Sequence, residues 1–177
     1  EDLSARYQAE LANGFGNLAS RTIAMIQRYD EAIIPPPSDY TERDLQVQRI
    51  VADAATAADD AIERFRIDEA IAAVWTIVDD LNLYITENEP WALAKDEANR
   101  ARLNTVLYTA AEGLRALAVL LSPFTPIATE KLWVALGAGE SLGRLLDQPI
   151  REAGAWGILR PGTSVGGLEP LFPRIEQ

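Results

Sequence analysis

The spacing of apolar side chains predicts a chain of helices. The first apolar stripe recurs three and four residues apart, at Leu11, Phe15, Leu18, Thr22 and Met25. This spacing places the five side chains on one face of a helix, which we expect over about residues 2–28. The following Pro35–Pro37 run has its backbone φ angles fixed, so we expect an extended loop there.

Two further helices are predicted by capping signals and a second apolar stripe. Thr41–Asp44 resembles a capping box and would open a helix that ends near Phe65. Asp68 can cap a third helix that ends near Asn88. The core side of this third helix would carry Ile71, Val74, Trp75, Val78, Leu81 and Ile85.

The second half of the chain predicts two more helices and a tail. After a short turn at Glu89–Trp91, a fourth helix is expected over about residues 97–121. Its inward residues would be Leu103, Val106, Leu107, Leu114, Leu117 and Leu121. Thr125 as cap and Pro126 at the first helical position would start a fifth helix, which ends near Gly137. A short helix around 141–146 and an irregular tail would follow.

The placement of helix breakers supports a single fold class. No proline occurs in residues 38–89 or 91–122, where the long helices are expected. We therefore predict an all-α fold, an antiparallel bundle of about five helices with an irregular C-terminal tail. Residues 1–137 would form the bundle, and residues 138–177 the short helix and the Gly- and Pro-rich tail. Periodicity alone gives no function.

Composition excludes several chemistries. The 177 residues contain no Cys and no His, which removes thiolate nucleophiles, imidazole bases and the usual zinc ligands. No stretch is apolar enough for a membrane span, and we expect no membrane partner. Carboxylate pairs such as Asp79 and Asp80 show no convergent ligand set, so we predict no metal site and no catalytic residue. The chain starts at Glu1 without an initiator Met, so we expect it to be part of a longer protein.

The net charge of −11 comes from one block of the sequence. Residues 30–99 hold seventeen acidic and five basic side chains, whereas residues 1–29 hold three of each and residues 100–177 hold seven acids and eight bases. Only two lysines occur, so the sequence does not predict a broad phosphate-binding surface. The acidic block fits a solvated helix face, or else an acidic docking surface.

Three side chains stand out as candidates for a binding site. Asn17 and Arg21 are four residues apart on the first helix, off the core stripe, and both side chains can hydrogen-bond the edges of nucleobases. The alternative is an ordinary polar helix face. Trp91 follows Pro90, which favours an at least half-exposed ring; the alternative is a tryptophan that plugs the core.

The same segments resemble the anticodon-binding domain of class I aminoacyl-tRNA synthetases. The Asn-Leu-x-x-Arg pattern at Asn17–Arg21 is similar to the helix that opens this domain. The Pro-Trp pair and the Leu-Phe-Pro-Arg ending favour the methionyl form over the valyl, leucyl, isoleucyl and cysteinyl forms. The resembling segments cover nearly the whole chain: Asn13–Thr22, Asn82–Ile85, Glu89–Lys95, Leu121–Pro126 and Pro170–Ile175.

The resemblance implies recognition of the CAU anticodon loop of the methionine tRNA. In that family the ring matching Trp91 stacks on the first anticodon base. The side chains matching Asn17 and Arg21 donate to base edges and to the adjacent backbone, and Asn82 and Pro90 would shape the pocket.

It also implies that the chain is one part of a cytoplasmic methionine–tRNA ligase. The chain alone would be inactive and would bind no cofactor, because ATP, magnesium and any zinc belong to the ligase's catalytic domain. We expect the isolated chain to be monomeric. Its tail, from Gly162 to Gln177, would pack toward the catalytic domain and expose Leu168, Leu171 and Phe172. The alternatives are the same module from a related synthetase, or a helical adaptor that binds proteins.

Overall fold

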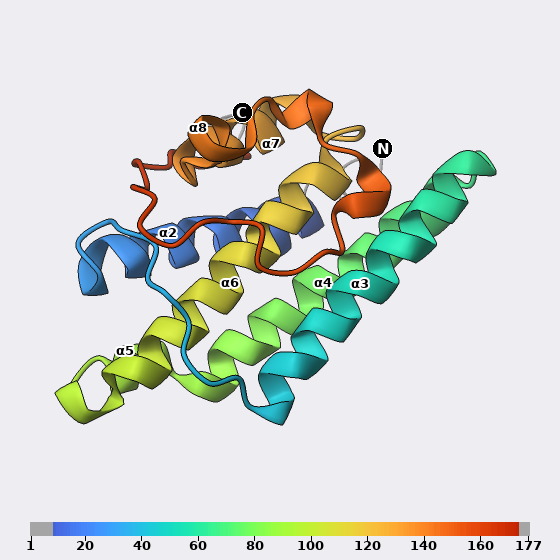
Figure 1. The fold of residues 1–177 in the computed structure, drawn as a ribbon. Coiled ribbons are helices and arrows are strands. Elements are labelled where there is room, and N and C mark those ends of the chain that lie inside the picture. The colour runs from blue at the N-terminus through green and yellow to red at the C-terminus, as the bar shows by residue number, and fades with distance from the viewer. Residues whose placement is uncertain (1–8, 174–177) are drawn as a thin grey trace.

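A long antiparallel hairpin of two helices forms one side of the computed structural model, which describes residues 9–173 (Figure 1). The hairpin consists of α3 (Glu42–Glu63) and α4 (Ile67–Asn88). At the start of α3, the Thr41 hydroxyl accepts the Asp44 N–H while the Asp44 carboxylate accepts the Thr41 N–H. The predicted capping box is therefore confirmed, and it fixes where α3 begins.

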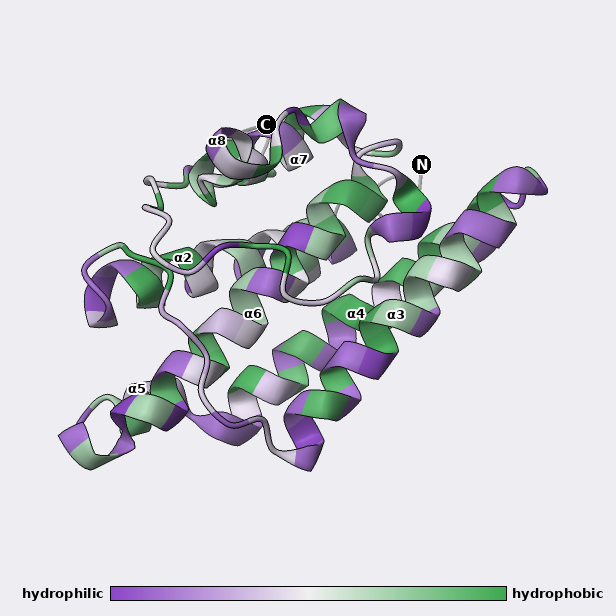
Figure 2. Ribbon diagram, viewed as in Figure 1, coloured by the Kyte–Doolittle hydropathy of each residue, from purple (hydrophilic) through white to green (hydrophobic). Residues whose placement is uncertain are grey.

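The third long helix, α6 (Arg100–Leu121), packs against both arms of the hairpin and is the centre of the fold. From Thr105 to Leu121 every residue of α6 is buried, so this part of the helix has no solvent face. All three long helices carry both apolar and polar segments in the hydropathy colouring (Figure 2). The buried stretch of α6 includes the charged residues Glu112 and Arg115, so α6 is the central helix of the core without being uniformly apolar.

The N-terminal helix crosses behind α6 and packs against α6 and α4 (Figure 1). Its regular part is α2 (Asn17–Tyr29), and the preceding residues Leu11–Gly16 form wider, π-helical turns, η1. Gly14 allows the close approach to α4, because a Cβ at this position would lie 3.1 Å from the Trp75 ring. The predicted helix is confirmed over the described residues; residues 2–8 lie outside them.

Short elements complete the fold. The connection from α4 to α6 contains α5 (Pro90–Leu93) and the 3₁₀ turn η2 (Glu97–Asn99). Beyond α6 come α7 (Pro126–Ala135), α8 (Ala138–Leu142) and the 3₁₀ turns η3 (Leu145–Asp147) and η4 (Ile150–Glu152). The predicted all-α class is confirmed: within residues 9–173 the one extended pairing is a single antiparallel bridge between Ile33 and Ser164.

The C-terminal segment crosses the front of α6 and joins the same hydrophobic core (Figure 1). Tyr108 on α6 donates to the Leu159 carbonyl at 2.7 Å, and the Gly166 N–H donates to Ala135 O at the end of α7. The expected exposure of the tail side chains is wrong for Leu171, which is buried, and for Phe172, whose ring packs 6.2 Å from that of Phe15. Leu168 is half-buried, and residues 174–177 lie outside the described part.

Three further sequence predictions are corrected by the structure. Asp68 does not cap α4, because the tight turn at Phe65 lets the helix begin at Ile67, with Arg66 at the cap position. The short helix expected at 141–146 is α8 plus η3, since Gly143 has a φ of 84° that interrupts it. Trp75 is only half-buried, because it lies against Gly14 at the margin of the core.

None of the helices described is both long and apolar enough to cross a membrane.

Candidate nucleic-acid interface

The outer face of α2 carries the two donor side chains that the sequence singled out. Asn17 and Arg21 are exposed, whereas Leu18 and Thr22 beside them are buried. Within residues 9–173 neither donor side chain makes a hydrogen bond or an ion pair, so both remain available to a ligand. Asn17 directly follows the π-helical turns and donates its backbone N–H to Ala12 O. Such turns frequently occur at functional sites.

Trp91 is held outward by its neighbours in α5. Pro90 is buried at the first helical position, and Leu93 packs on the core, while the Trp91 side chain is 41% exposed. Glu89 precedes them with a left-handed φ of 47°, which turns the chain sharply out of α4. A ring presented in this way on an anchored turn is a suitable stacking platform for a base.

Two long-range hydrogen bonds tie α2 to the elements on either side of α5. Asn82 on α4 donates its side-chain amide to Gly14 O at 3.3 Å, one turn before Asn17. At the other end of α2, the Arg100 guanidinium donates to Tyr29 O at 2.7 Å. The turn η1, directly before α2, is thus fixed to α4, and the end of α2 is fixed to α6. Helices α4 and α6 flank the connection that presents Trp91.

A pocket of about 400 Å³ lies beside Asn17. Its wall on the helix side includes Asn13 and Ser20, and its other wall is the tail segment Pro170–Pro173. The Phe172 ring contributes to this wall and also lies over Gly16. Polar amides thus face an aromatic and proline wall, an arrangement that suits a planar base with polar edges.

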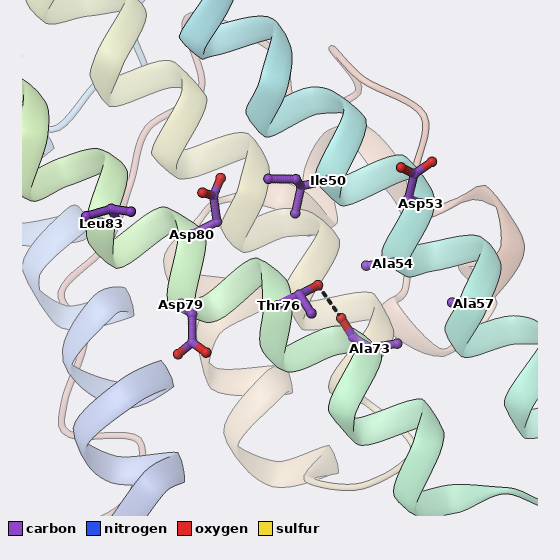
Figure 3. Close-up of a pocket in the computed structure, with 9 residues that line it drawn as sticks. All are labelled: Ile50, Asp53, Ala54, Ala57, Ala73, Thr76, Asp79, Asp80 and Leu83. Carbon is purple, nitrogen blue, oxygen red and sulfur yellow. Dashed lines mark hydrogen bonds between the residues drawn. The ribbon is translucent and has the colours of Figure 1, made fainter.

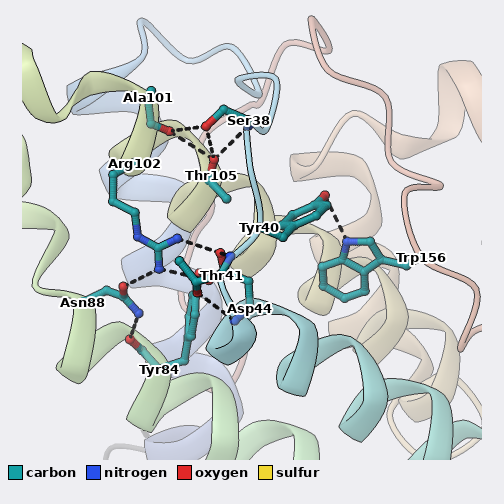
Figure 4. Close-up of polar contacts among 10 residues, drawn as sticks. All are labelled: Ser38, Tyr40, Thr41, Asp44, Tyr84, Asn88, Ala101, Arg102, Thr105 and Trp156. Atoms are coloured by element: carbon teal, nitrogen blue, oxygen red, sulfur yellow. Dashed lines mark hydrogen bonds and ion pairs between the residues drawn. The ribbon is translucent and has the colours of Figure 1, made fainter.

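A buried polar network sets the geometry of the Trp91 connection (Figure 4). The Asp44 carboxylate accepts two hydrogen bonds from the Arg102 guanidinium, at 2.6 and 2.9 Å, and one from the Tyr84 hydroxyl at 2.6 Å. Arg102 also donates to Asn88, the last residue of α4, at 2.7 Å. The network therefore joins the start of α3, the end of α4 and the start of α6, and it brackets Glu89–Asn99.

The sequence predictions did not find this network. The sequence predicts only a capping role for Asp44 at the start of α3 and no role for Asn88 or Arg102. A usable signal exists, since Tyr84 and Asn88 are four residues apart on the core side of α4 and both are polar.

The charge on Asp44 is stabilised by its partners. Burial opposes ionisation, but the hydrogen bonds from Arg102, Tyr84 and Thr41 outweigh it and hold the pKa of Asp44 below its ordinary value. Burial and the neighbouring carboxylate raise the pKa of the Tyr84 phenol, so it stays protonated and donates. Because the folded pKa of Asp44 is depressed, its contribution to stability is present above about pH 4 and is lost as the pH falls below that value.

Replacing Arg102 by methionine should expose the dependence of the fold on this carboxylate. We expect Arg102→Met to lower the free energy of unfolding at pH 7 by about 2 kcal/mol, since Asp44 loses its charged donor in a buried site. The acid loss of stability should also begin at a higher pH, because the pKa of Asp44 rises. Urea unfolding between pH 3 and 7 measures both effects. Arg49→Met, which breaks an exposed pair with Glu42, should cost under about 0.5 kcal/mol; equal losses in the two variants would contradict the interpretation.

A surface groove of about 580 Å³ lies elsewhere, between α3 and α4 (Figure 3). Its floor is apolar, with Ile50 and Leu83 among the lining residues, and Asp53 and Asp79 stand at its edge. Asp80 at the same edge is paired with Arg43 at 2.9 Å. No basic side chain lines this groove, so its charge disfavours an RNA phosphate. Among residues 9–173, no group of three or more acidic side chains is placed to hold a metal ion.

Comparison with known proteins identifies the family of the chain. Residues 46–155 match the family model described as the anticodon-binding domain of tRNA ligase. This range includes Asn82, Pro90 and Trp91 but not Asn17 or Arg21. A methionine–tRNA ligase of Streptomyces coelicolor is 46% identical over 180 residues, which is 100% of this chain and 34% of the relative. One from Caldanaerobacter subterraneus is 38% identical, over 99% of this chain and 27% of the relative.

Solved structures of methionyl-tRNA synthetases are also similar to this chain. Methionyl-tRNA synthetase of Mycobacterium tuberculosis in complex with methionyl-adenylate superimposes with a TM-score of 0.86 at 27% identity, covering 98% of this chain and 33% of that one. Its apo form gives 0.84 at 27% identity, covering 95% and 33%. The chain thus spans about a quarter to a third of the length of the proteins that it matches. Because the family model covers well over half of the chain, the chain belongs to the family of anticodon-binding domains of tRNA ligases.

Proposed function

We propose that this chain is the anticodon-reading part of a methionine–tRNA ligase and that its target is the CAU anticodon loop of the methionine tRNA. The observation that carries the proposal is that Asn17 and Arg21 are exposed, unbonded donors on α2 and that Trp91 is turned outward on an anchored turn. The relatives support methionine as the amino acid of the proposed ligase, because those of Streptomyces coelicolor and Caldanaerobacter subterraneus are both methionine–tRNA ligases.

The proposed mechanism is recognition of single-stranded bases without a broad basic surface. The Trp91 ring takes one base in a stack, which contributes about 1–3 kcal/mol. Asn17 and Arg21 donate to the edges of neighbouring bases and to the backbone, and each good bidentate contact adds about 1–3 kcal/mol of discrimination. Asn82 and Pro90 act indirectly, because Asn82 holds the turn η1 directly before α2 and Pro90 fixes the turn that carries the ring.

The remaining functions belong to the rest of the proposed ligase. Its catalytic domain would bind ATP, magnesium, methionine and any zinc, and would carry out aminoacylation in the cytoplasm. This chain contributes no group that touches the reacting atoms and is inactive alone. We propose that the isolated chain is a monomer, which sedimentation can test.

Alanine substitutions on α2 test the assigned donors. Arg21→Ala and Asn17→Ala should each weaken binding of an anticodon stem-loop by about 1–3 kcal/mol, roughly tenfold to a hundredfold. Both side chains are exposed and unbonded, so stability should change by less than about 0.5 kcal/mol. Fluorescence titration and thermal melting of the same samples provide the two readouts. Gln27→Ala, at an exposed site farther along α2, is the control for RNA binding and should bind normally. It is not a control for stability, because the Gln27 side chain donates to Gly166 O at 3.3 Å. Normal RNA binding by both Asn17→Ala and Arg21→Ala would remove the assignment.

A further inference from the structure

The turn between α3 and α4 carries the most exposed large hydrophobic side chain among the described residues. Phe65 is 90% exposed, and Ile67, the first residue of α4, is 47% exposed. Phe65 also has a φ of 59°, in the left-handed region that bulky residues rarely adopt. An aromatic ring kept in water on a strained backbone costs stability, and such strain clusters at functional positions. We call residues 64–67 the hairpin tip.

The hairpin tip differs in charge from the helices that lead to it. Arg64 and Arg66 flank Phe65, and both are exposed. Their contacts with carboxylates are long, at 3.5 Å to Asp60 and 3.5 Å to Glu69. The tip is thus an aromatic centre with a cationic rim at the end of an acidic hairpin. It fits an apolar pocket edged by carboxylates on a protein partner, since aromatic and arginine side chains are the common anchors of interfaces.

The position of the hairpin tip also points to one partner. The tip and α5 lie at opposite ends of α4 (Figure 1), a helix of 22 residues and therefore about 33 Å long. The tip also lies near the point where the described chain enters the bundle. Glu10 and Leu11 line a hollow of about 350 Å³ together with Asp68 and Ile71, just beyond the tip on α4.

We propose that the hairpin tip is the docking surface for the catalytic domain of the full-length ligase. This inference rests on the proposed function, in which the remaining two-thirds of the relatives' length supplies that domain. A tRNA carries its anticodon and its amino-acid acceptor end at opposite ends, so the catalytic domain must lie on the side away from Trp91. The hairpin tip is on that side, and Phe65 inserts into the catalytic domain as the anchor.

The test uses the full-length ligase and amide hydrogen exchange in the absence of RNA. Phe65→Asn removes the ring and places at this φ a residue that tolerates it. We expect exchange to rise at least tenfold at residues 62–70 and at one patch of the catalytic domain. Stem-loop affinity should stay within twofold of the parent. The control is Leu83→Asn. Leu83 lies on α4 and is 53% exposed, but it lines the groove of Figure 3 and is not part of the hairpin tip. The exchange pattern of this variant should match that of the parent.

Three other results would overturn the proposal. Unchanged exchange in the catalytic domain of Phe65→Asn would show that the tip does not dock. A lower melting temperature with increased exchange throughout α6 would mean that Phe65 supports the fold instead. Unchanged exchange combined with weaker whole-tRNA binding by Arg64→Ala and Arg66→Ala would assign the tip to RNA. Failure of the proposed function can be distinguished from failure of tip docking. If the proposed function is wrong, the parent protein does not bind the stem-loop, whatever the exchange pattern.

Discussion

Replacing Glu112 by alanine is expected to lower the free energy of unfolding by about 3–5 kcal/mol. Glu112 is fully buried on α6, and its carboxylate accepts hydrogen bonds from Arg115 Nε at 2.8 Å and from the backbone N–H groups of Ile158 and Leu159 at 3.1 and 2.8 Å. Arg115 in turn donates to Ala153 O at 3.0 Å and Ala155 O at 2.9 Å. Without Glu112 the guanidinium keeps a buried charge that no carboxylate balances.

The same substitution should release the tail from α6. Amide exchange at residues 153–159 should increase more than exchange within α3 or α4, because Glu112 directly bonds two of these amides. Urea unfolding gives the total loss, and Glu130→Ala on the exposed face of α7 is the control, expected within about 0.5 kcal/mol of the parent. A loss of under 1 kcal/mol for Glu112→Ala would mean that the tail is held by apolar packing alone.

Replacing Trp91 by alanine should weaken binding of the anticodon stem-loop by about 1–3 kcal/mol, roughly tenfold to a hundredfold. The effect comes from the loss of a stacking surface, so Trp91→Phe should retain part of the affinity. The free energy of unfolding should change little, since the ring is 41% exposed and the turn remains held by buried Pro90 and by Leu93.

Trp133 provides the opposite pattern as a control. Its ring is 1% exposed, and its Nε1 donates to Gly143 O at 3.0 Å. Trp133→Ala should therefore cost about 3–5 kcal/mol of stability, while the folded fraction binds RNA normally. Melting and titration of both variants separate the two roles. If Trp91→Ala melts like Trp133→Ala and its folded fraction binds at full strength, Trp91 is a core residue and the stacking role is lost.

Local signals in the sequence were sufficient for most helix boundaries. The Thr41 capping box, the Pro126 start of α7 and the absence of proline from α4 and α6 act through the backbone within a few residues, so they can be read from the chain directly. Signals that depend on tertiary packing could not be read in this way. The burial of α6 on all sides, and of Glu112 and Arg115 within it, arises only because the tail returns across that helix from 40 residues away.

The candidate site shows the same division. The four-residue spacing of Asn17 and Arg21 and the Pro90–Trp91 pair mark side chains that local geometry turns outward, and the structure places all three of these polar or aromatic side chains on the surface. Their assigned roles in RNA binding remain predictions. The supports of this site, such as the bonds from Asn82 to Gly14 and from Arg102 to Asn88, join residues 68 and 14 positions apart. No periodicity in the sequence reports such pairs.

The most direct test of the proposed function is a titration of this chain with anticodon stem-loops that differ only in the anticodon. Binding to the CAU loop should be tightest, and a change of any one of its three bases should weaken it by about 1–3 kcal/mol. A tighter complex with a valine, leucine, isoleucine or cysteine anticodon would assign the chain to a related ligase. Equal affinity for all loops, or no binding to any of them, would contradict anticodon reading by Asn17, Arg21 and Trp91 altogether.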